Sequence, residues 1–223
     1  MLKKCFLSPF FMPLFFILCW GGFAGVIYKY HASDILLFTK EGGFVEDVAH
    51  IGYVILIACL IYFCNDYKDK IRSWGIYLFL AMCCFLREFG LHRHLSKTDT
   101  TPFKSRFFLN PNNPVGEKIV FGLFLLIILG VVIYLGVKYS KHLVKSFFEL
   151  NTVTWSIATM CVIGVVSKYI DRFPANYRKA NGGVGLSDDV YKIFQLVEET
   201  SEMFIPYIAV LILCQYHLKR NEV

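Results

Sequence analysis

The sequence has few charged residues, and this shortage argues against a soluble protein. Only 18% of its 223 residues are Asp, Glu, Lys or Arg, whereas 56% are hydrophobic. Soluble domains are closer to a quarter charged, and they do not contain several apolar runs of nearly twenty residues. We therefore expect an integral membrane protein. In such a protein, the excess of Lys and Arg behind the net charge of +6 sets the orientation of the spans and contacts anionic lipid headgroups. We expect no binding to nucleic acid.

Several motifs with a known chemistry are also missing. The sequence contains no Walker A, GxGxxG, GxSxG or HExxH motif, which argues against the nucleotide-binding, hydrolase and zinc-protease families that use them. Its eight cysteines include no CxxC spacing, so they predict neither a disulfide framework nor a zinc finger. We find no internal repeat of 20–50 residues.

Uncharged apolar stretches predict an all-α polytopic membrane protein, a bundle of six transmembrane helices in a single domain that covers residues 1–223. A helix needs about 20 residues to cross the hydrocarbon core. The stretches 73–86 and 203–216 have only 14 uncharged residues each, so both must extend into charged sequence. The predicted spans are residues 6–28, 45–65, 73–92, 117–137, 150–170 and 190–216.

These extensions place ionisable residues inside the membrane at one face. The sixth span must extend backwards, because its carboxyl end meets the basic segment His217-Leu218-Lys219-Arg220. In a six-span topology, the start of the second span, the end of the third, the end of the fifth and the start of the sixth all share one side. The acids there are Glu46, Asp47, Glu88, Asp171, Glu198, Glu199 and Glu202, and the fixed cations are Arg87, Lys168 and Arg172.

The charges on this face do not balance. Seven acids against three fixed cations leave four negative charges, so either some carboxylates are protonated or cations bind. Glu46 and His50 are four residues apart, as are Glu88 and His92, so each pair occupies one face of a helix. Carboxylate and imidazole together suit zinc, iron or manganese. We therefore predict a divalent metal ion with Glu46, His50, Glu88 and His92 as its ligands.

This arrangement predicts a metal-dependent hydrolase that acts on a membrane lipid or a lipid-linked substrate. Metal-activated water would attack the substrate, with a glutamate as the general base. The predicted catalytic residues are Glu198, Glu202 and Arg87, and the predicted binding residues are Asp171, Arg172 and Glu199.

Other interpretations remain open. The same carboxylates would suit a proton- or cation-coupled transporter or a membrane sensor, and a third alternative is a structural subunit of a membrane complex. Lys168 and Arg172 can instead extend to lipid headgroups, and Asp47 can simply favour the start of a helix. The short basic connections NDYKDKIRSWG and KYSKHLVK favour a plasma (inner) membrane protein with both termini in the cytoplasm. It would act alone, as a homo-oligomer or with another membrane protein.

Overall fold

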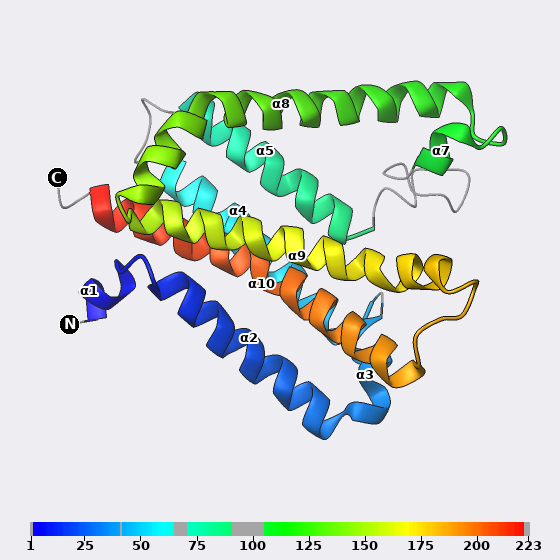
Figure 1. The fold of residues 1–223 in the computed structure, drawn as a ribbon. Helices are drawn as coiled ribbons and strands as arrows, with labels where there is room; N and C mark the ends of the chain where they lie inside the picture. The colour runs from blue at the N-terminus through cyan, green and yellow to red at the C-terminus, as the bar shows by residue number, and fades with distance from the viewer. Residues whose placement is uncertain (1, 41, 65–70, 91–104, 221–223) are drawn as a thin grey trace. The chain divides into compact units, whose positions relative to one another are not determined.

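The computed structural model describes residues 2–40, 42–64, 71–90 and 105–220, and these residues form helices and their connections without a β-strand (Figure 1). The structure therefore confirms the all-α prediction. The helices are α1 (Leu2–Phe6), α2 (Phe11–Tyr30), η1 (Ala32–Asp34), α3 (Ile35–Thr39), α4 (Phe44–Cys64), α5 (Ile71–Glu88), α7 (Ser105–Leu109), α8 (Val115–Phe148), α9 (Thr152–Ala180) and α10 (Asp188–Arg220).

Four of the described helices, α2, α4, α8 and α9, are long and apolar enough to cross a membrane. The six-span prediction is therefore not confirmed. Helix α5 has 18 residues and includes three charges, Arg72, Arg87 and Glu88. Helix α10 has 33 residues, but carboxylates precede its apolar stretch and basic residues follow it. Charge at these positions reduces the apolar length of both helices below that of an ordinary span.

The chain divides into two compact units. The first comprises residues 1–59 and 146–223, and the second comprises residues 60–145. The first unit holds α2, α3, α9, α10 and most of α4. The second holds α5, α7, most of α8 and the end of α4.

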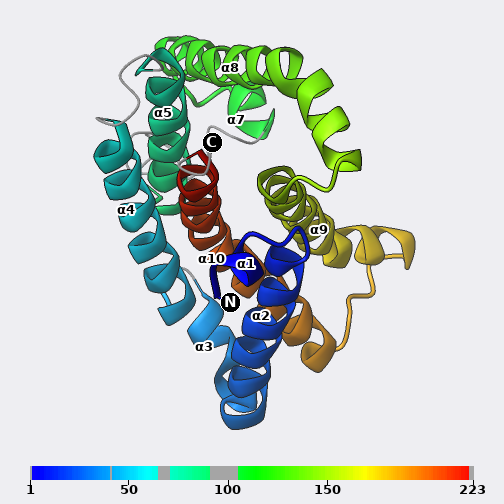
Figure 2. The same ribbon diagram turned by 90° about the vertical axis from the view of Figure 1, so that its left-hand side faces the viewer.

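Helix α10 is the centre of the first unit. It packs against α9, α2 and α3, and both ribbon views show α9 and α10 side by side (Figures 1 and 2). Its apolar side contributes to two buried clusters. One joins α10 to α2, α3 and α4 through Ile27, Ile35, Val45, Ala49, Leu196 and Met203. The other joins it to α2 and α9 through Met12, Ile163, Ile208 and Ile212.

Hydrogen bonds tie the chain's first residues to the far ends of α9 and α10. Gln215 is fully buried; its amide nitrogen donates to the carbonyl of Phe6 at 2.8 Å. Its amide oxygen accepts a hydrogen bond from the Ser156 hydroxyl at 2.6 Å. The hydroxyl of Thr152 donates to the carbonyl of Leu7. These contacts satisfy backbone carbonyls where α1 ends, which is required of polar groups in an apolar environment.

Helix α4 approaches α10 closely at Gly52. A Cβ atom at this position would lie 2.7 Å from the ring of Tyr207 and 2.8 Å from the ring of Pro206. The Tyr207 hydroxyl donates to the carbonyl of Val48 at 2.7 Å, which fixes the ring against α4. Only glycine leaves room for this contact.

The second unit includes the most apolar helix. The membrane-spanning window of α8 has no buried residue, and large side chains such as Leu123, Leu126 and Val137 are exposed along it. Before this helix, the amide of Asn113 donates to the carbonyl of Phe107 at 2.7 Å. The ring of Phe107 packs edge-on against that of Phe121 at 5.5 Å. A largely exposed apolar helix suits contact with lipid chains.

Candidate functional site

The strongest concentration of polar groups in the first unit lies on the hairpin formed by α9 and α10. Helix α10 continues without interruption through the three carboxylates predicted to matter, Glu198, Glu199 and Glu202. Its first turn carries Asp188 and Asp189. Their negative charges stabilise the amino-terminal end of the helix, where the helix dipole is positive. A turn joins the helices, with Gly182 and Gly183 at φ values of 62° and 98° that suit glycine.

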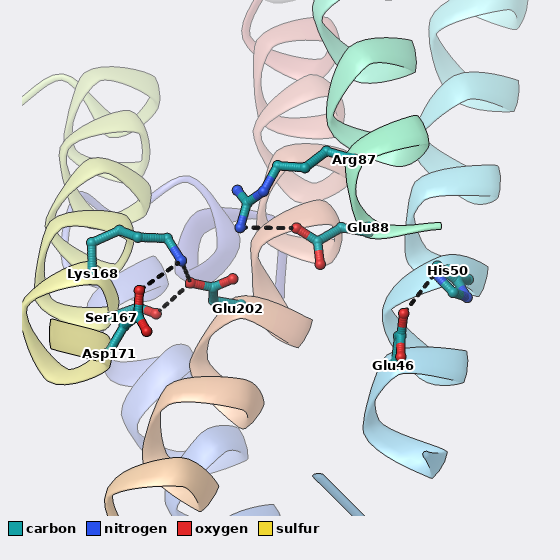
Figure 3. Close-up of polar contacts among 8 residues, drawn as sticks. All are labelled: Glu46, His50, Arg87, Glu88, Ser167, Lys168, Asp171 and Glu202. Atoms are coloured by element: carbon teal, nitrogen blue, oxygen red, sulfur yellow. Dashed lines mark hydrogen bonds and ion pairs between the residues drawn. The ribbon is translucent and has the colours of Figure 1, made fainter. Parts of the chain in front are cut away.

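Glu202 is the centre of a polar network between the two helices (Figure 3). Its Oε1 atom accepts a hydrogen bond from the Ser167 hydroxyl at 2.7 Å and lies 2.6 Å from Nζ of Lys168. Lys168 also lies 3.9 Å from Oδ2 of Asp171. Ser167 is fully buried, and the side chain of Glu202 is 16% exposed. A carboxylate among apolar helices requires such partners, and Lys168 supplies the opposite charge.

Next to this network, α9 and α10 line a partly open cavity of about 350 Å³. Its charged lining residues are Asp171 and Arg178 from α9 and Glu198 and Glu199 from α10. The remaining lining residues are Ile170, Pro174, Ala175, Tyr191, Phe194 and Gln195. When ionised, three carboxylates and one guanidinium give the lining a net charge of −2. The cavity therefore favours ligands that carry a positive group.

A proline lies in the cavity wall. Pro174 is inside α9 and has no backbone N–H, so it cannot make the helical hydrogen bond to the carbonyl of Ile170. Both residues line the cavity.

The predicted residues of the hairpin thus divide between two places. Asp171, Glu198 and Glu199 line the cavity, whereas Glu202 belongs to the network with Ser167 and Lys168. Arg172 is exposed and is not part of the cavity lining.

The predicted metal ligands that the structure describes belong to α4 and α5. On α4, Nε2 of His50 lies 3.8 Å from Oε1 of Glu46, and Glu46 also accepts a hydrogen bond from the backbone N–H of Gly42. On α5, in the second unit, the guanidinium of Arg87 lies 3.5 Å from the carboxylate of Glu88 (Figure 3). His92 lies outside the described residues. Among the residues that the structure describes, no group of three His, Cys, Asp or Glu side chains is placed to hold a metal ion.

Sequence reasoning missed Arg178 and Gln195, although spacing could have identified both. Arg178 follows Asp171 by seven residues, two helical turns later on the same face of α9. Gln195 precedes Glu199 by four residues on α10. The contact of Ser167 with Glu202 had no comparable signal, because the two residues are 35 positions apart and belong to different helices.

No protein-family profile, curated protein or solved structure matches this chain. In the part of the chain that the structure describes, the fold is all-helical and four helices are long and apolar enough to span a membrane. Within the first unit, the α9–α10 hairpin combines a charged cavity with an inter-helix ion pair. This geometry supports the functional proposals below.

Proposed function

We propose that this membrane protein binds the polar headgroup of a membrane lipid or lipid-linked substrate in the α9–α10 cavity. The observation that carries the proposal is a charged cavity of about 350 Å³ against α9, a helix able to span a membrane. This volume lies in the range of small-molecule sites, roughly 300–1,000 Å³.

Within this proposal, the cavity residues bind and Glu198 performs the chemistry. Glu198 lines the cavity, and in this proposal its carboxylate accepts a proton from the water that attacks an ester, amide or phosphoester bond. Glu199 and Asp171 bind the headgroup from the same cavity. Glu202 acts by holding α9 against α10 through Lys168 and Ser167.

Hydrolysis with a divalent metal ion remains the proposed reaction. Zinc, iron or manganese would activate the water, with Glu46, His50, Glu88 and His92 as the proposed ligands and Arg87 as a partner for an anionic group. Support for this part comes from the residue types and from the contact between Glu46 and His50. Metal analysis of protein purified without chelator tests it. A fixed ratio of metal that is lost in His50→Ala is expected, and a folded, metal-free but active protein would exclude it.

Incubation of the purified protein with an extract of membrane lipids tests the reaction. Mass spectrometry should detect cleaved lipid with the parent protein and no cleavage with Glu198→Gln. Glutamine keeps the size and hydrogen bonding of glutamate but removes the charge, so the melting temperature in detergent should change little. The matched control is Asp188→Asn, an exposed acid in the first turn of α10. Equal cleavage by Glu198→Gln and the parent would contradict the assigned role.

The ion pair between Lys168 and Glu202 favours a second candidate function, proton- or cation-coupled transport or sensing. A lysine 2.6 Å from a carboxylate between two helices can change partners when a proton or cation binds, and this would alter the hairpin. Proteoliposomes that contain a pH-sensitive dye test this function. Proton uptake that is lost in Glu202→Gln, without lipid cleavage, would favour it over hydrolysis.

A further inference from the structure

The two ends of the α9–α10 cavity carry opposite charge. Arg178 follows Asp171 by seven residues, which places it about 10 Å further along α9 at ~1.5 Å per residue. The backbone at Gly185 passes this end, because a Cβ atom there would lie 3.8 Å from Nε of Arg178. The guanidinium therefore belongs to the end of the cavity next to the turn between the helices.

Two contacts fix the register of α10 against α9, and they show where the carboxylates of α10 lie along the length of the cavity. Lys168 meets Glu202, and the rings of Phe173 and Phe194 stack at 4.8 Å. In an antiparallel pair, this register places Glu198 at the level of Asp171 and Tyr191 at the level of Arg178. The cavity therefore has a carboxylate end and a guanidinium end.

The carboxylate end is built from hydrogen-bond acceptors. Asp171, Glu198 and Glu199 line the cavity. A primary ammonium group has three N–H donors and one positive charge, so it can donate to several carboxylates at once. A quaternary ammonium has the charge but no N–H donor.

We propose that the cavity binds a primary ammonium group that is joined by a short linker to an anionic group. The ammonium meets Asp171 and Glu199, beside Glu198, and the anion meets the guanidinium of Arg178, which suits phosphate and carboxylate groups. The headgroup of an ethanolamine phospholipid and free phosphoethanolamine both have this chemistry. This inference rests on the proposed function, because it names the substrate class of the same cavity.

Native mass spectrometry of the full-length protein in detergent tests the ligand class. The protein is mixed with equal amounts of phosphatidylethanolamine, phosphatidylcholine and phosphatidylglycerol that have the same acyl chains, and the bound lipid is counted. We expect phosphatidylethanolamine to exceed each of the others by about tenfold, since hydrogen bonds to charged groups are worth roughly 1.5–3 kcal/mol. Parallel samples contain free phosphoethanolamine as a competitor. This comparison needs no variant, so it does not depend on the folding of a mutant.

Variants then locate the binding. Glu198→Gln combined with Glu199→Gln should remove the preference for ethanolamine over choline. Arg178→Gln should weaken the binding of phosphatidylethanolamine while the protein still melts near the parent temperature. The matched controls are Lys179→Gln, next to Arg178 on α9 but outside the cavity lining, and Asp188→Asn. Both controls should keep the parent preference.

The possible outcomes separate this inference from the proposed function. Binding of the three lipids without a preference for ethanolamine would overturn the ligand class but leave lipid binding in place. Release of the lipid by free phosphoethanolamine at similar concentration would support the ligand class and indicate a soluble source. No binding of any lipid or of phosphoethanolamine would overturn both proposals. Retained preference in the double glutamine variant would exclude this cavity as the site.

Discussion

The side-chain nitrogen of Lys168 lies 2.6 Å from Oε1 of Glu202, and this contact joins α9 to α10. The same oxygen accepts the hydrogen bond of the Ser167 hydroxyl. One carboxylate therefore combines an ion pair with a hydrogen bond from a buried hydroxyl. These two contacts offset the free-energy cost of removing the carboxylate of Glu202 from water.

The Lys168–Glu202 pair should show measurable coupling in a double-mutant cycle. Lys168 is 44% exposed, so solvent weakens the attraction, and we expect a coupling of about 1 kcal/mol between Lys168→Gln and Glu202→Gln. Unfolding in detergent measures the four proteins of the cycle. As a control, Lys179→Gln and Glu202→Gln should be additive. A coupling near zero would show that the ion pair contributes nothing to the stability of the hairpin.

A methyl group at Gly52 should separate α4 from α10. Gly52→Ala would place its Cβ 2.7 Å from the Tyr207 ring, and overpacking of this kind costs roughly 1–3 kcal/mol. Gly164→Ala on α9 is the matched control, because nothing lies within 4 Å of its Cβ position. Alanine there should maintain or increase the melting temperature, since it favours a helix by about 1 kcal/mol over glycine. Equal melting temperatures for the two variants would contradict this close approach.

The buried pair of Ser156 and Gln215 should make each single substitution costly. Ser156→Ala leaves the amide oxygen of Gln215 without this donor, and Gln215→Leu removes the partner of both Ser156 and the carbonyl of Phe6. We expect each change to lower the free energy of unfolding by about 1–3 kcal/mol. The double variant should be less destabilised than the sum of the two. Strict additivity in detergent unfolding would show that the two side chains do not interact.

Topology reporters distinguish six spans from four. With six spans, fusions after Lys70 and Lys141 report the cytoplasm, and fusions after Ser105 and Gly183 report the exterior. If only α2, α4, α8 and α9 cross, Lys70 and Ser105 lie on one side, and Gly183 lies on the same side as the carboxyl terminus. The two patterns differ at Ser105 relative to Lys70, so one pair of fusions decides whether α5 crosses. A fusion at the carboxyl terminus decides the same question for α10.

Much of the helical architecture follows from the sequence because it depends on local composition. A run of apolar residues such as 119–137 specifies a long helix with exposed apolar side chains, and α8 has both properties. The described residues contain no β-strand, as these long apolar runs predict. The number of spans does not follow, because α5 and α10 contain charges whose cost depends on what surrounds them.

The sequence alone determined that Glu198, Glu199 and Glu202 would lie on one helix next to an apolar run, because the helical period acts over a few residues. Only the tertiary structure decided that Glu198 and Glu199 would line a cavity while Glu202 would pair with Lys168. It also brought Arg178 and Pro174 to the same cavity. These placements depend on the register in which α9 packs against α10. That register is set by contacts between residues far apart in the chain, such as Phe173 with Phe194, and local sequence does not specify it.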